Sequence, residues 1–327
     1  MKRTLFFTLT SISFVAACGG SGGSDGLGNG NPPSAMIQIT SANAVDVTKA
    51  SYAAALASAS LSELSGETGF IASAPGGVSK VGGVVSAASK AGPAPAQVVI
   101  PPTESLCDMG GSVTVSGRIA DIVTPSLSAG DFFDLEFDMC DDGLGAVTDG
   151  NLHFDVDAFA GDFLGGLYDM TMTLSLDNFQ VATIEDTVTS NGEATVTLNT
   201  ANSPSVSASV NGSSMTVDAN ASSETLRNFL SAQTLDGGVF PSPFTMTASG
   251  SLDTTQISGS VRYSTPVMFE GFDSDYPGIG EFLVTGDGSS ARLIAESSVN
   301  VRIELDTVGD GVINETINTT WSELNTP

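Results

Sequence analysis

The feature that most constrains this chain is a period-two alternation of apolar and polar residues, which recurs from Val113 to Leu305. Successive side chains of a β-strand point to opposite faces, so each alternating set predicts a strand with one apolar and one polar face. Antiparallel sheets commonly have one packed and one solvated face. The apolar positions of the sets are Val113 and Val115; Phe133, Leu135, Phe137 and Met139; Leu152, Phe154 and Val156; Met170, Met172, Leu174 and Leu176; Val196 and Leu198; Val206, Ala208 and Val210; Met215 and Val217; Phe244, Met246 and Ala248; Ile257 and Val261; Phe282 and Val284; and Val299, Val301, Ile303 and Leu305.

Gly-containing pairs separate these sets and predict hairpin turns, because glycine readily adopts the positive φ that such turns require. The pattern predicts roughly a dozen strands. The expected fold is mainly β: a large antiparallel meander that forms a curved sheet, an open barrel or a sandwich. Ser222–Gln233 fits either a short helix or another strand. The turn pairs are Asp149-Gly150, Asn191-Gly192, Asn211-Gly212, Gly237-Gly238 and Asp310-Gly311.

A membrane-spanning β-barrel shows the same alternation and is the alternative to be weighed. Its strands run about 10 residues and carry aromatic girdles at both interfaces. Here many sets are shorter, and aromatic residues make up only 7% of the chain. The pattern therefore favours a β domain outside the membrane.

The chain before residue 103 has a different character. Asn43–Ala59 is rich in alanine, with apolar residues at helical spacing, and Asn43 is a suitable N-cap. We expect a helix there. From Gly66 to Pro102 the composition shifts to Gly, Ala and Ser and ends in a Pro cluster, which is typical of a boundary.

The first 18 residues resemble the signal of bacterial lipoproteins. Lys2 and Arg3 precede a short apolar stretch that ends in the lipobox-like Val15-Ala16-Ala17-Cys18. That stretch is shorter than the roughly 20 residues that span a bilayer. An ordinary signal peptide that happens to end in Cys is the alternative. The resemblance implies acylation of Cys18, with palmitate among the chains, and cleavage just before it.

The residue after the cysteine is Gly19 rather than Asp, which in that family implies transfer to the outer membrane. Two or more acyl chains hold a protein stably on its membrane. We therefore divide the chain into a signal peptide (1–17), a flexible tether (18–34), a helix-bearing segment (35–102) and an antiparallel β domain (103–327).

Two stretches, Ser126–Gly143 and Gly259–Leu324, resemble an uncharacterised group of β-rich proteobacterial envelope lipoproteins. The resemblance covers about half of the chain and rests on strand and turn patterns. It implies a place in the cell envelope, and it transfers no catalytic residue.

The net charge of −27 excludes several function classes. Such a charge repels nucleic acids and anionic lipid head groups, which argues against binding either of them. An acidic surface suited to saline surroundings is the simplest explanation, since salt screens the repulsion.

Cys107 and Cys140 are the two cysteines that remain beside Cys18. In an exported chain an isolated pair predicts a disulfide. A metal site or a reactive thiol is the alternative, although no His lies within a few residues of either cysteine.

Catalytic motifs are scarce. The chain has one histidine, His153, so a Ser–His–Asp site would have to use it. Its neighbours Asn151, Asp155 and Asp157 alternate with apolar residues, which favours a solvated position on the polar face of a strand. Paired carboxylates of the glycosidase kind remain open, because acidic residues are so numerous.

One acidic face is a hypothetical metal site. If 131–139 and 151–157 form a hairpin, then Asp134, Glu136, Asp138, Asp155 and Asp157 share its polar face with His153. Ca²⁺ prefers several carboxylate and carbonyl oxygens, so Ca²⁺ is the candidate cofactor. A solvated acidic surface without any cofactor is the alternative.

Asp306 and Asp310 form a second acidic feature. They superficially resemble a calcium loop, but Val308 and Ile317 stand where oxygen ligands are needed. A tight acidic turn is the better interpretation.

These observations predict an outer-membrane lipoprotein, held by its lipid, that acts as a non-enzymatic binding or structural module, with an unknown protein or apolar ligand as its partner. A carrier of lipid or another apolar ligand in a β-sheet cavity is the second hypothesis. A hydrolase is the third.

Overall fold

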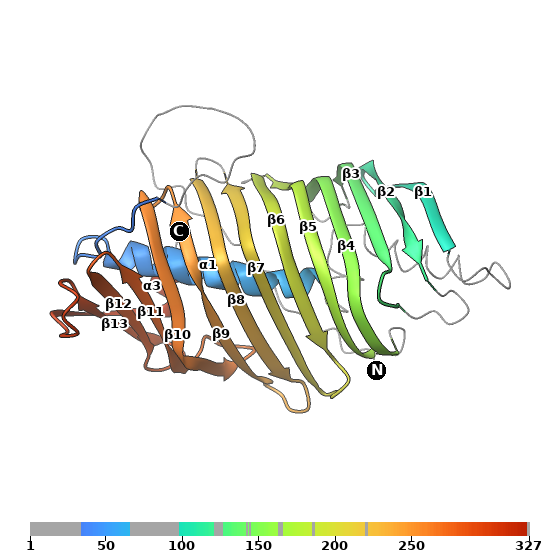
Figure 1. Cartoon of the computed structure of the whole chain (residues 1–327). Helices are drawn as coiled ribbons and strands as arrows, with labels where there is room; N and C mark the ends of the chain where they lie inside the picture. Colours follow the sequence, from blue (N-terminus) through green and yellow to red (C-terminus); the bar gives the residue numbers. More distant parts are fainter. Residues whose placement is uncertain are drawn as a thin grey trace.

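The computed structural model describes residues 34–65, 98–120, 127–141, 143, 145–162, 166–184, 187–219 and 222–325. In these residues, 14 strands form one antiparallel sheet whose order follows the chain from β1 to β14 (Figure 1). β1 and β14 are the two ends of this order, and each pairs with one neighbour, β2 and β13. The two end strands are not paired with each other, so the sheet is open. The predicted antiparallel meander is confirmed, and of the three predicted forms it is the curved open sheet.

The elements follow one another along the chain. In chain order they are α1 (Ala44–Ser65), β1 (Val98–Leu106), β2 (Gly110–Ile119), β3 (Phe132–Asp141), β4 (Ala146–Asp162), β5 (Leu167–Thr183), β6 (Thr187–Asn199), β7 (Ser205–Ala219), β8 (Ser222–Asp236), β9 (Pro243–Thr254), β10 (Gly259–Phe272), β11 (Ile279–Gly286), β12 (Ser289–Ala295), β13 (Asn300–Asp306), β14 (Glu315–Thr320) and α3 (Trp321–Asn325).

Several strands are longer than their alternating sets suggested; β4 and β5 have 17 residues each. For β4, β6 and β7 the reason is that three of the five glycine pairs are not hairpin turns. Gly150, Gly192 and Gly212 lie inside β4, β6 and β7. Gly150 has a φ of 94° at a register shift between β4 and β5, so the strand continues through a bulge.

Ser222–Gln233 belongs to β8, and the helical alternative is wrong there. β8 pairs along most of its length with β7 and β9. Two flanking strands satisfy its backbone groups on both sides, which outweighs any local helix preference.

The predicted helix is confirmed as α1, which begins directly after Asn43. The N-cap side chain acts differently from the expectation. Asn43 Oδ1 accepts a hydrogen bond from the backbone N–H of Thr40, at 2.7 Å, and so closes the turn that precedes the helix.

The sheet curls around α1. The helix runs across the strands on one face of the sheet and contacts β6 to β9 as well as β11 and β12 (Figure 1). Ala54 and Ala55 are buried, as are Thr48 and Ser51, so this side of the helix packs closely against its neighbours. Tyr52 anchors it, with its ring 5.6 Å from Phe269, 5.7 Å from Phe282 and 5.2 Å from Trp321.

The N-terminal end of the described chain joins three hairpins. Met36 forms a parallel bridge with Ser260 at the β9–β10 hairpin. The carbonyl of Ile37 accepts a hydrogen bond from Asp287 in the β11–β12 turn. Gln38 donates to Thr307 in the β13–β14 loop.

The boundary drawn after Pro102 falls inside β1, where a register shift separates Ile100 from Thr103. β1 is an edge strand, and prolines are tolerated there because one side of the strand needs no partner. The expected signal peptide, residues 1–17, and Cys18 lie outside the described residues. Among the helices that are described, none is long and apolar enough to cross a membrane.

Candidate functional site

The outer face of β3 and β4 carries the predicted acidic residues. Phe133, Leu135 and Phe137 of β3 are buried on the inner face, which turns Asp134 and Glu136 outward. The strands pair so that Asp134 lies opposite His153, and Glu136 lies opposite Asn151. The prediction that 131–139 and 151–157 lie side by side is confirmed.

His153 links two carboxylates on this face. Its Nδ1 lies 2.6 Å from Asp134 Oδ1, and its Nε2 lies 2.9 Å from Asp155 Oδ2. Partial burial disfavours the imidazolium, but the hydrogen bonds and charges of the two aspartates outweigh this and raise the pKa of His153. When it is protonated, the ring is the counter-ion for both carboxylates.

This arrangement differs from a Ser–His–Asp site. Such a site needs one imidazole nitrogen on the hydroxyl and the other on the carboxylate. Here both nitrogens face carboxylates. Ser175 is the cross-strand neighbour of His153 on β5, but its hydroxyl points to Glu193 at 3.4 Å.

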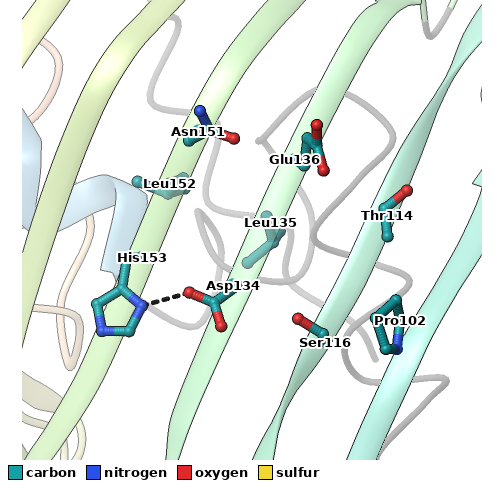
Figure 2. Close-up of a pocket in the computed structure, with 9 residues that line it drawn as sticks. All are labelled: Pro102, Thr114, Ser116, Asp134, Leu135, Glu136, Asn151, Leu152 and His153. Carbon is teal, nitrogen blue, oxygen red and sulfur yellow. Dashed lines mark hydrogen bonds and ion pairs between the residues drawn. The ribbon is translucent and has the colours of Figure 1, made fainter.

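A shallow cavity of about 240 Å³ lies on the same face, over β1 to β4 (Figure 2). Most of the lining surface is apolar, but six of the nine lining residues carry polar groups: hydroxyls from β2, carboxylates from β3, and an amide and the imidazole from β4. The lining residues are Pro102, Thr114, Ser116, Asp134, Leu135, Glu136, Asn151, Leu152 and His153.

Sequence reasoning missed Thr114, Ser116 and Pro102 as part of this site. Thr114 and Ser116 were visible as the polar positions of an alternating set. Their place beside Glu136 and Asp134 follows from the β2–β3 register, which no local pattern specifies.

The remaining predicted ligands are spread out. Asp138 lies opposite Ser112 of β2, beyond the cavity lining. Asp157 accepts a hydrogen bond from Thr173 at 2.8 Å. Across the described ranges, no three His, Cys, Asp or Glu side chains are grouped closely enough to hold a metal ion.

Asp306 forms a tight acidic turn. Its carboxylate accepts backbone hydrogen bonds from Val308, Gly309 and Gly311, at 2.7–3.2 Å. Desolvation opposes its ionisation, but these hydrogen bonds prevail and lower the pKa of Asp306. The carboxylate is thus directed at its own loop, as the turn interpretation requires.

Cys107 and Cys140 form the expected disulfide, with Cα atoms 5.5 Å apart. Strict alternation along β3 would place Cys140 on the polar face and Met139 on the apolar face, but the structure shows the reverse. Cys140 is buried, whereas Met139 is exposed, because Met139 has a φ of 48° and the β3–β4 register shifts between Phe137 and Cys140. A bulge at the end of β3 therefore exchanges the two faces.

One further titratable residue was missed, Glu224 at the start of β8. It is only 6% exposed. Burial raises the pKa of its carboxyl group, and a hydrogen bond from Thr254 lowers it. Burial is the larger effect, so the pKa rises to about 7. Gln256 donates to its Oε1 at 3.1 Å. Glu224 lies two residues before buried Leu226 and therefore on the same face of β8. The alternation of β8 could thus have predicted that Glu224 is buried.

No family model matches this chain, and comparisons with curated proteins and with solved structures gave no significant match.

Proposed function

We propose that this chain is a membrane-anchored envelope lipoprotein whose sheet acts as a non-enzymatic binding module. The signal-like start with Cys18 supports the anchor and an outer-membrane location. The observation that carries the binding role is the cavity over β1 to β4, where Asp134 and Glu136 stand beside hydroxyls and an amide.

The chemistry of this cavity favours a positively charged group of a partner protein. Carboxylates bind ammonium and guanidinium groups through charge-assisted hydrogen bonds. Glu136 is the carboxylate in the lining that His153 does not contact, so it is the residue we expect to meet the ligand. Ca²⁺ is the alternative occupant.

Other uses of the molecule have less support. A carrier would need an apolar cavity, but α1 occupies the concave side of the sheet between β6 and β12. A hydrolase of the Ser–His–Asp type would need an imidazole nitrogen that faces the serine, and both nitrogens of His153 face carboxylates. These two observations support binding over transport and over Ser–His–Asp catalysis.

The binding role can be tested with a short Lys/Arg peptide and, separately, Ca²⁺, at a fixed high ionic strength. Asp134→Asn with Glu136→Gln should abolish saturable peptide binding. Asp169→Asn with Glu193→Gln removes the same charge from β5 and β6, outside the cavity, and should leave binding unchanged. Equal loss in both double variants would mean that only net charge matters. A Ca²⁺-specific rise in melting temperature that the first double variant removes would favour the metal.

The anchor has its own test. Cys18→Ser should abolish acylation and move the protein from the membrane to the soluble fraction, because that thiol alone would carry the lipid. Intact-mass analysis of the wild-type protein checks this directly. An unprocessed chain without added lipid mass would contradict the anchor.

A further inference from the structure

The first described residues, 34–38, contact the sheet at one end of its strands. The loops that follow odd-numbered strands lie at the same end of the strands, because the sheet is an antiparallel meander. Residues 34–38 bind three of these loops: Ser34 contacts Asp253 and Ser260, and the following residues reach the β11–β12 turn and Thr307. We call this end of the sheet the entry rim and the other end the far rim.

The β13–β14 loop at the entry rim displays apolar side chains on an ordered backbone. Asp306 accepts hydrogen bonds from three backbone N–H groups of the loop, and Asp310 Oδ1 accepts one from Val312. Despite this order, Val308 is 61% exposed, Val312 59% and Ile313 43%. A loop held in one conformation loses little entropy when its side chains are buried by a partner.

We propose that the β13–β14 loop docks onto the lipid surface that carries the acyl anchor, with Val308, Val312 and Ile313 inserted among the head groups. The inference rests on the lipid anchor proposed above. From Cys18 to Ser34 the chain spans at most about 55 Å, since each residue reaches no more than about 3.3–3.6 Å. The anchor therefore holds the entry rim closest to the bilayer.

The far rim also carries exposed apolar residues, but at a greater distance from the anchor. Val239 and Phe240 in the β8–β9 loop are 57% and 86% exposed. β8 has 15 residues, so this loop lies about 50 Å from the entry rim at 3.3–3.4 Å per residue. It could reach the same membrane only with the whole tether extended alongside the strands, which makes it a suitable internal control.

Charge defines the kind of lipid surface. Asp310 lies between Val308 and Val312 in the sequence, Glu315 follows Ile313, and Glu315 accepts a hydrogen bond from Ser41. Carboxylates at this position would repel anionic head groups. A neutral, zwitterionic surface such as phosphatidylcholine is therefore the expected partner.

The test uses the full lipidated chain in phosphatidylcholine vesicles. Val312→Cys or Phe240→Cys adds a free thiol for an environment-sensitive fluorophore, because Cys107 and Cys140 are paired. Lipids with nitroxide groups near the head group should quench the label at 312 strongly and the label at 240 weakly. Vesicles rich in phosphatidylglycerol should give less quenching at 312.

Two further measurements keep the outcomes distinct. Val308→Ser in the chain labelled through Val312→Cys should reduce the quenching, whereas Val239→Ser should not. Intact mass of the same samples reports whether Cys18 is acylated. Acylated protein with no quenching at 312, or with equal quenching at 240, overturns the docking alone. Protein without acyl mass overturns the anchor and the docking together.

Discussion

His153 is the residue whose charge depends most directly on its neighbours on the outer face. Asp134 and Asp155 raise its pKa above the ordinary value of 6.5. A group whose pKa rises on folding contributes stability below its unfolded pKa, and that contribution is lost as pH increases through the folded pKa. The contribution should therefore be full below about pH 6.5.

His153→Gln should remove this pH-dependent component and cost about 0.2–1 kcal/mol at low pH, because the three side chains are partly exposed. The measurement is the unfolding free energy in urea between about pH 5 and pH 8. An unchanged pH profile in the variant would show that the two contacts contribute nothing in solution.

Glu224 should affect the pH dependence of stability in the opposite sense to a carboxylate whose pKa falls on folding. Its pKa rises on folding to about 7, so the folded state favours the protonated form. Stability should therefore fall as pH rises from about 4.5 to 7, since the unfolded chain releases its proton first. Glu224→Gln should stabilise the protein by about 2–3 kcal/mol at pH 8 and change little at pH 4.

The matched control for Glu224 is Glu270→Gln, because Glu270 is exposed on β10. Unfolding in urea at both pH values compares the two variants. Similar shifts in both would assign the effect to net charge rather than to burial of Glu224.

At the scale of single elements, β4 depends on a glycine at its bulge. A Cβ at Gly150 would lie 2.1 Å from the carbonyl oxygen of Asn178, and its φ is 94°. Gly150→Ala should therefore destabilise the protein by about 1–3 kcal/mol. Gly145 has a similar φ of 95° but no atom within 4 Å of such a Cβ. Gly145→Ala thus isolates the backbone effect and should cost less in thermal unfolding.

α1 depends on Tyr52 for its place against the curled sheet. The ring packs among Phe269, Phe282 and Trp321, and the residue is 4% exposed. Tyr52→Ala should cost about 3–5 kcal/mol, because a cavity would remain among these rings. Tyr52→Phe keeps the ring and its aromatic contacts and should therefore cost much less. Equal melting temperatures for the two variants would contradict this role of the ring.

At the scale of the whole molecule, the open sheet has two edges and a covalent crosslink near one of them. The disulfide joins the end of β3 to the β1–β2 connection, with a sequence separation of 33. Replacing both cysteines by serine should cost about 3–4 kcal/mol on the chain-entropy model. Urea unfolding checks the value, and free thiols at both positions in the mature protein would refute the crosslink.

The acidic face shows how far sequence patterns could reach toward the candidate site. The alternation of 131–139 and 151–157 predicted that Asp134 and His153 share a polar face, and the strand register confirms it. The contribution of Thr114 and Ser116 could not be predicted, because it depends on which strand lies next to β3. Likewise, a local bulge reversed the expected facing of Cys140 and Met139.

The sequence by itself determined that this chain forms antiparallel strands with one apolar and one polar face, because a period of two is a local property of the backbone. It also determined the helix after Asn43 and the pairing of Cys107 with Cys140. Only the tertiary structure decided that the sheet stays open and curls around α1, and that Gly150, Gly192 and Gly212 continue strands instead of ending them. The physical reason is that bulges, register and closure depend on contacts between residues distant in sequence, whose geometry no short pattern encodes.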